Sequence, residues 1–209
     1  MSDQVRSDRM AGYARLGKGM LIAAAVVLGM FVLLIIHYSS YITDSGSHTV
    51  SVRGDIRALK TALHSYEVDY HHFPIPQNGK PTEDFQTRSR GVLLQVLLGE
   101  NISMLNPQEV RYDEFRKAKG HRHGLWQDGT EWVLSDYWCE PFHIILDTNK
   151  DDQIANPEFG ADQSNSEHAA KSKSHPPPEM LPLHVLVYSS GPDRDPKTWR
   201  DNVCSWRAH

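Results

Sequence analysis

The chain has 209 residues, enough for one globular domain and an accessory segment. Its formal net charge of −4 argues against a dedicated nucleic-acid-binding protein, which would carry a basic face. The two cysteines, Cys139 and Cys204, form no CxxC pair, so a zinc ribbon or a redox motif is unsupported. They allow one disulfide or two free thiols, and both interpretations stay open.

Near the N-terminus, Met20–Ile36 is an apolar segment without a charged residue. As a helix it would be about 25 Å long, close to the roughly 30 Å of a bilayer core, and residues up to Tyr41 suit the interface. Its N-terminal flank carries the basic residues Arg6, Arg9, Arg15 and Lys18. We therefore predict a basic cytoplasmic tail over residues 1–19 and a transmembrane helix over 20–41.

Two other interpretations of this segment compete with a retained span. A cleaved secretory signal would have a shorter apolar region followed by an A-x-A-like site, whereas "HYSSYITDSGS" follows here. A buried core helix would not require such a long uncharged run next to a basic flank. The span is the interpretation that both its length and its flank favour.

An amphipathic helix is predicted over residues 50–72. Apolar side chains recur there at spacings of four and three, which places them on one helical face: Val52, Ile56, Leu59, Leu63, Tyr66 and Tyr70. Pro74 and Pro76 follow and end the helix.

The remaining residues, 73–209, are predicted to form a globular head. "GVLLQVLL" predicts a short helix, and "EWVLSDYW", "FHIILD" and "LHVLVYSS" predict strands. Residues 111–131 are interpreted as an exposed charged loop and 160–180 as a flexible polar loop. The predicted fold class is α+β: a long N-terminal helix, membrane span plus amphipathic half, packed on a small antiparallel β-sheet head.

Four local patterns resemble the type IV pilin and pseudopilin superfamily, and most closely its general secretion pathway protein G family. They occur in that family's order and cover the chain from about residue 50 to its end: "DIRALKTALHSYEVDYHHFP", "GVLLQVLL", "DYWCEPF" and "SSGPDRDPKTWRDNVCSW". In the third, Tyr137 stands where the family has proline and Cys139 where it has glycine. The resemblance implies a pilin-like fold.

The resemblance also implies a function without catalysis. The family's subunits assemble through the N-terminal helix into a homo-oligomeric helical filament of the type II secretion system, in contact with other pseudopilin subunits and an inner-membrane secretion platform. It implies a single-pass protein of the bacterial inner membrane, with the N-terminus cytoplasmic and the head periplasmic.

The leader is where the chain departs from this pattern. By resemblance, prepilin peptidase would cut after Gly19, and the new terminus at Met20 would be methylated. The family's acidic fifth residue is replaced by Ala24. This departure favours an alternative function: an uncleaved, single-pass, membrane-anchored periplasmic binding protein with a pilin-like head.

The C-terminal loop is the first candidate metal site. In the resembling family this loop binds Ca²⁺, which takes carboxylate and carbonyl oxygens. By resemblance the ligands would be Asp193 and Asp201, with Asn202 in place of a second aspartate, a backbone carbonyl near Ser190, and Asp195 as a further candidate. A solvated acidic turn without an ion is the alternative.

A second candidate metal loop, "DTNKDDQIANPE", follows from spacing alone. Asp147, Asn149 and Asp151 occupy positions one, three and five of a calcium loop, and Glu158 occupies position twelve. Position six is Asp152 rather than glycine. An Asx-rich hairpin turn without metal explains the same residues and is the favoured interpretation.

Nothing in the sequence indicates catalysis. The twelve histidines include His71-His72 and His121-x-His123, and neither pair has a carboxylate or cysteine at a recognisable ligand spacing. No G-x-S-x-G or H-E-x-x-H pattern occurs. The prediction is that the protein is not an enzyme.

Overall fold

The computed structural model describes residues 29–30, 32, 48–76, 82–160 and 177–207. It divides the chain into two units, Met1–Ser47 and His48–His209. In the first unit only Gly29, Met30 and Val32 are described, and they are helical. The second unit is called the head below.

The prediction of a long N-terminal helix that contains a membrane span is corrected by the structure. The first extended helix among the described residues begins at residue 48. Within the described ranges, no helix is both long enough and apolar enough to cross a membrane. The predicted location as a single-pass inner-membrane protein is contradicted by the same finding. Almost all of the predicted span at 20–41, the tail over 1–19, the cleavage site at Gly19 and Met20, and Ala24 lie outside the described residues.

Residues 48–70 form the head helix, where the sequence predicts one over 50–72. Its buried face consists of the side chains spaced for it: Val52, Ile56, Leu59, Ala62, Leu63 and Tyr66, all at most 2% exposed. The helix ends at His71, whose φ of 58° is left-handed and whose amide donates to the carbonyl of Glu67. Pro74 then prevents its continuation.

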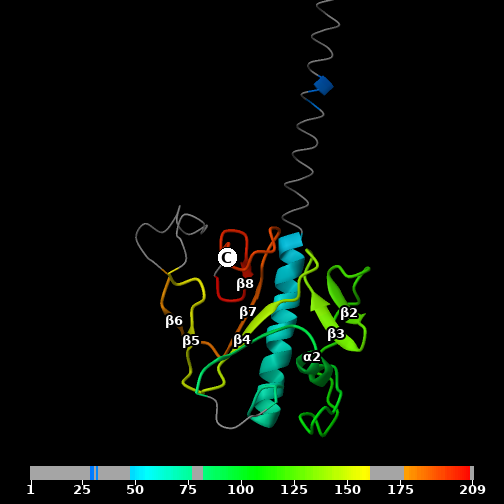
Figure 1. Ribbon diagram of the computed structural model, residues 1–209, viewed down its shortest axis with the longest axis vertical. Helices are drawn as coiled ribbons and strands as arrows, with labels where there is room; N and C mark the ends of the chain where they lie inside the picture. The colour runs from blue at the N-terminus through cyan, green and yellow to red at the C-terminus, as the bar shows by residue number, and fades with distance from the viewer. Residues whose placement is uncertain (1–28, 31, 33–47, 77–81, 161–176, 208–209) are drawn as a thin grey trace, which may run out of the picture. The chain divides into compact units, whose positions relative to one another are not determined.

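A four-stranded antiparallel sheet lies beside this helix (Figure 1). Its strands, in spatial order, are β1 (Phe85–Arg88), β4 (His143–Leu146), β7 (Val185–Ser189) and β8 (Val203–Cys204). Leu146 of β4 pairs with Phe85 on one side and with Val185 on the other. This register decides which residues meet at the end of the sheet.

The two central strands of the sheet, β4 and β7, are largely buried on both faces, as their near-continuous apolar sequences indicate, whereas β1 is partly exposed. Along β4, Ile144 and Leu146 belong to the main core with the head helix, whereas Ile145 belongs to a second cluster with Ile154 and Leu181. The alternation follows from the two-residue period of a strand. The head therefore has three layers, with the helix on one side of the sheet.

Two small hairpins and a short helix complete the head. β2 (Gly124–Asp128) pairs with β3 (Glu131–Ser135), and β5 (Ile154–Ala155) pairs with β6 (Met180–Leu181). The helix α2 (Val92–Leu97) buries four of its apolar side chains. The two hairpins lie on opposite sides of the head helix in Figure 1.

One loop prediction differs from the structure, and the other lies largely outside the described residues. The segment 111–131, interpreted as an exposed loop, contains β2, because Leu125 and Trp126 pair with Leu134 and Val133 across the hairpin. Most of the predicted loop at 160–180, residues 161–176, lies outside the described residues.

Both cysteines are free thiols in the structure, so the disulfide that the sequence allows is not formed. Cys204 is buried in an aromatic cluster with Tyr188 and Trp199. Cys139 is partly exposed in the turn after β3, where its φ of 71° is a conformation that favours glycine. Glycine, which the resembling family has at this position, therefore suits this backbone conformation better than cysteine does.

Candidate metal sites

The first candidate site lies in the loop that follows β4. Asp147 is 2% exposed and comes directly after Leu146. Its Oδ1 accepts hydrogen bonds from the amides of Lys150 and Asp151, and its Oδ2 accepts one from the amide of Asp152. One carboxylate thus organises a tight Asx-type turn, as the non-metal interpretation requires.

Asp147, Asp152 and His184 nevertheless form a candidate metal site, since their ligand atoms lie within 4.8 Å of one another. His184 Nδ1 is 3.2 Å from Asp147 Oδ2, and its Nε2 is 3.7 Å from Asp152 Oδ1. Asp152 and His184 are exposed and Asp147 is buried. The site is therefore half open to solvent, and its buried member, Asp147, is held in place by backbone amides.

A second, all-carboxylate group shares Asp147 and adds Asp84 and Asp151. Burial raises the pKa of Asp84, and the neighbouring carboxylates of Asp147 and Asp151 raise it further. Oδ1 of Asp84 is buried without a hydrogen-bond donor among the described residues. Three carboxylates this close repel one another unless a proton or a cation is shared between them.

The strand register explains why the sequence does not reveal Asp84 and His184. Both precede a strand that pairs with β4, since Phe85 and Val185 each lie opposite Leu146. Each residue therefore comes beside Asp147 from a distant part of the chain, and the Asp147 amide donates to the His184 carbonyl. Predicting that Asp84 and His184 lie beside Asp147 would have required knowing that β1 and β7 flank β4 in the sheet.

The structure brings together part of the calcium-loop pattern. Asn149 and Asp151 lie in the same turn as Asp147, and Asp152 has the left-handed φ of 64° that glycine usually supplies at position six. Glu158 does not join them, because both its carboxylate oxygens accept hydrogen bonds from Arg207. The spacing therefore identifies the turn but not a complete calcium loop.

The C-terminal loop is the second candidate site. Gly191, with a φ of 70°, lies against Asp201 so closely that an added Cβ would be 2.5 Å from the Asp201 carbonyl oxygen. The Asp193 amide is 3.4 Å from Asp201 Oδ2, and the carboxylate of Asp193 is the second largest cause of a raised pKa at Asp201, after burial. Two of the predicted ligands are thus close neighbours.

Two oxygens of this loop lack hydrogen-bond donors among the described residues. They are Oδ1 of Asp201 and Oδ1 of Asn202, and Asn202 is 4% exposed. The amide nitrogen of Asn202 is used, since it donates to the Pro196 carbonyl. Buried acceptors without donors are costly, and carboxylate and amide oxygens are the kind of ligand that Ca²⁺ takes. The chemistry of these two residues is therefore compatible with a cation.

The other two predicted ligands have different surroundings. Ser190 is 1% exposed, and its Oγ is 3.0 Å from His143 Nε2, so only its backbone carbonyl remains as a candidate ligand. Asp195 is exposed, and its Oδ1 accepts a hydrogen bond from the Lys197 amide. Asp193 is exposed as well, and its Oδ1 accepts a hydrogen bond from the Asp195 amide, so Asp201 and Asn202 are the better-supported pair.

Arg207 holds this loop against the head. Its guanidinium donates hydrogen bonds to the Glu158 carboxylate and also to the backbone carbonyls of Asn202 and Trp199. Trp199 and Trp206 in turn pack around Tyr188 of β7. The C-terminal segment is therefore attached to the sheet by a buried ion pair and by an aromatic cluster.

Comparisons of the chain with protein-family models, with curated proteins and with solved structures found no match. The resemblance to pseudopilins therefore rests on the four sequence patterns. The structure adds a candidate metal site, formed by Asp147, Asp152 and His184.

Proposed function

We propose that the protein is a pseudopilin-like structural subunit, without catalytic activity, that polymerises with copies of itself into a secretion filament. The observation that carries the proposal is the C-terminal acidic loop, where Asp201 and Asn202 leave buried oxygens without donors at the place where the resembling family binds Ca²⁺. The head helix packed on an antiparallel sheet, to which that loop is attached, also supports it.

Ca²⁺ is the cation we propose for this loop. The ligand atoms at Asp193, Asp201 and Asn202 are all oxygens, and the loop supplies no sulfur or imidazole. Hard oxygen donors on an irregular loop suit Ca²⁺ better than Zn²⁺, which prefers nitrogen and sulfur, and better than Mg²⁺, which demands regular octahedral geometry. A bound ion would hold Asp193 and Asp201 together and stiffen the tail.

The partners we propose follow from the resemblance. Other pseudopilin subunits would surround each copy, and the apolar segment Met20–Ile36, outside the described residues, would be buried between copies. An inner-membrane secretion platform and, if the leader is processed after Gly19, a prepilin peptidase complete the set. Polymerisation would then stabilise each head by mass action.

Calcium is expected to raise the melting temperature of the full chain. At a free concentration about one hundred times the dissociation constant, one Ca²⁺ stabilises the folded state by about 2.7 kcal/mol. Thermal unfolding in CaCl₂, in MgCl₂ and in EDTA measures the effect. Asp201→Ala should remove most of the calcium-dependent increase, because it removes the most enclosed carboxylate of the loop.

Asp195→Ala is the matched control, since Asp195 lies in the same loop but is exposed. It should retain the calcium response. Asp147→Asn tests whether the calcium response comes from the candidate site after β4 instead. This variant should also retain the response. An equal melting temperature of the wild type in CaCl₂ and EDTA would exclude the calcium part of the proposal.

A further inference from the structure

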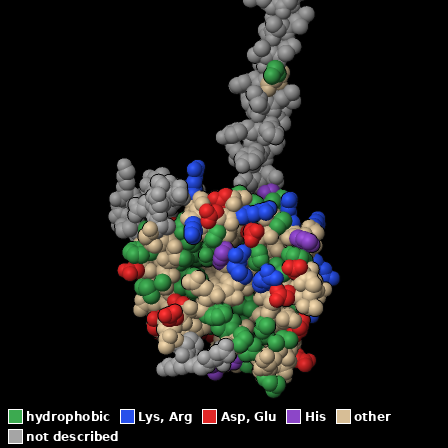
Figure 2. All heavy atoms as spheres, viewed as in Figure 1, with side chains coloured by type: hydrophobic (Ala, Val, Ile, Leu, Met, Phe, Trp, Pro, Cys, Tyr) green, Lys and Arg blue, Asp and Glu red, His purple; other side chains and the backbone are tan. Residues whose placement is uncertain are grey.

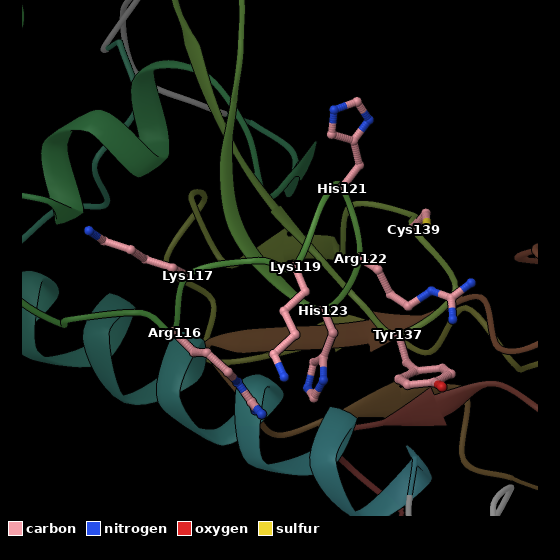
Figure 3. Close-up of a pocket in the computed structure, with 8 residues that line it drawn as sticks. All are labelled: Arg116, Lys117, Lys119, His121, Arg122, His123, Tyr137 and Cys139. Atoms are coloured by element: carbon pink, nitrogen blue, oxygen red, sulfur yellow. The ribbon is translucent and has the colours of Figure 1, made fainter.

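A basic pocket of about 690 Å³ lies on the head, and none of its lining residues belongs to either acidic loop (Figure 3). Its wall is formed largely by the segment 116–123, which connects to β2, together with the turn after β3. The residues that matter for its chemistry are Arg116, Lys117, Lys119, Arg122, His123 and Tyr137. Its volume falls within the range of small-molecule sites, about 300–1,000 Å³.

The backbone of this pocket is held by hydrogen bonds. The Ala118 amide donates to the Leu125 carbonyl, and the Leu125 amide donates to the Arg116 carbonyl. Gly124 permits this approach, because a Cβ there would lie 2.4 Å from the Arg116 carbonyl oxygen. The cationic side chains thus extend from a preorganised loop, which lowers the entropic cost of binding a ligand.

The positive charge of the pocket is mostly uncompensated. Arg116 pairs with Asp55 of the head helix at 3.1 Å, and His123 Nε2 lies 2.9 Å from the same carboxylate. Lys117, Lys119 and Arg122 form no ion pair with any described carboxylate. In a chain of net charge −4, these cations give the wall of the pocket a local excess of positive charge that favours anions.

The side chains are also oriented for binding. In Figure 3, Arg116, Lys119 and His123 point toward a common space beside the head helix, and Arg122 extends the other way, toward Tyr137. Lys117 and His121 point away from both. The guanidinium of Arg122 lies 5.2 Å from the centroid of the Tyr137 ring, a cation–π arrangement that holds it in place. Figure 2 shows Lys and Arg side chains gathered on one part of the head surface.

We propose that this pocket binds a small phosphate-bearing ligand, with Arg116 and Lys119 on one side of the pocket and Arg122 on the other as the groups that contact its phosphate oxygens. A planar guanidinium matches two phosphate oxygens at once, and an ammonium supplies a point charge. A multiply charged phosphate neutralises several cations, whereas a single carboxylate neutralises one. The pocket is a half-open hollow rather than a flat surface, so it suits a small molecule better than a flat acidic protein surface.

This inference does not depend on the proposed filament, since no residue of the pocket belongs to either acidic loop. The phosphate has two sources, a soluble molecule or the headgroup of a lipid. Both present the same oxyanion to the pocket, so the experiment includes a probe for each.

The test is calorimetric titration of the full chain with pyrophosphate at low ionic strength. The wild type should bind, and Lys119→Gln and Arg122→Gln should each weaken binding about tenfold or more, the expected loss of one charge-assisted hydrogen bond. Lys197→Gln removes an exposed cation from a distant loop and should change affinity less than about twofold. All three positions are exposed, and unchanged circular dichroism melts would show that each variant folds.

Two further probes decide the nature of the ligand. Vesicles containing phosphatidylglycerol, compared with pure phosphatidylcholine, support a lipid source if they bind with the same dependence on Lys119 and Arg122. Polyglutamate that binds as tightly as pyrophosphate, with the same dependence, would overturn the phosphate assignment in favour of an acidic protein. Absence of binding to pyrophosphate and to vesicles alike, or binding that neither variant weakens, would also overturn it.

Discussion

Glu158→Ala is expected to lower the free energy of unfolding by about 3–5 kcal/mol, because it leaves a buried guanidinium without its partner. The Glu158 and Arg207 side chains are 4% and 9% exposed, and their closest atoms are 2.8 Å apart. Both carboxylate oxygens are engaged, and Arg207 also ties down the Asn202 and Trp199 carbonyls. The substitution should therefore loosen the C-terminal loop as well as destabilise the head.

Urea unfolding of the wild type and the variant measures this loss. Glu131→Ala is the matched control, since Glu131 pairs with Arg90 at 2.7 Å but both side chains are about half exposed. The exposed pair should contribute no more than about 1 kcal/mol. Equal losses in the two variants would mean that the Glu158–Arg207 pair is not buried as described.

His143 should make the head less stable as the pH falls from about 6.5 toward 4. Burial and, to a smaller extent, the charge of the nearby Arg88 together lower the pKa of His143 to about 4. The folded state therefore binds this proton more weakly than the unfolded state does, and stability is lost as the unfolded-state histidine becomes protonated. Because the side chain is only partly buried and solvent screens part of the effect, the expected loss across this window is about 1–2 kcal/mol.

The comparison that isolates this effect is between the wild type and His143→Gln, measured in EDTA at pH 7.5 and at pH 4. His143 stacks on Tyr188 and contacts Ser190, so the variant should be less stable at pH 7.5. Because glutamine does not titrate, the stability advantage of the wild type should shrink at pH 4. An advantage that is unchanged between the two pH values would show that His143 is not the titrating group.

Much of the head could be predicted from periodicity and helix-ending residues. The apolar spacing from Val52 to Tyr66 and Pro74 define the head helix to within two residues at each end, and the apolar runs locate β3, β4 and β7. β5, β6 and β8 have two residues each, too few to show alternation. β2 was missed because it lies in a strongly charged segment.

The candidate sites show the same limit of local reasoning. The spacing of Asp147 and Asp151 identifies their turn, but Asp84 and His184 join it only through the pairing of β1 and β7 with β4. Glu158 has the right spacing for that turn, and its pairing with Arg207 comes from the tertiary fold. The basic run at 116–123 is plain in the sequence, whereas its proximity to Asp55 and Tyr137 is not.

The most direct test of the proposed function is sedimentation of the purified full chain, followed by electron microscopy of negatively stained samples, in CaCl₂ and in EDTA. The wild type in CaCl₂ is expected to form fast-sedimenting helical filaments, and Asp201→Ala should form fewer. Val27→Asp, which places a charge in the apolar segment, should not assemble. A wild-type chain that stays monomeric in CaCl₂ at every concentration would contradict the filament-subunit account.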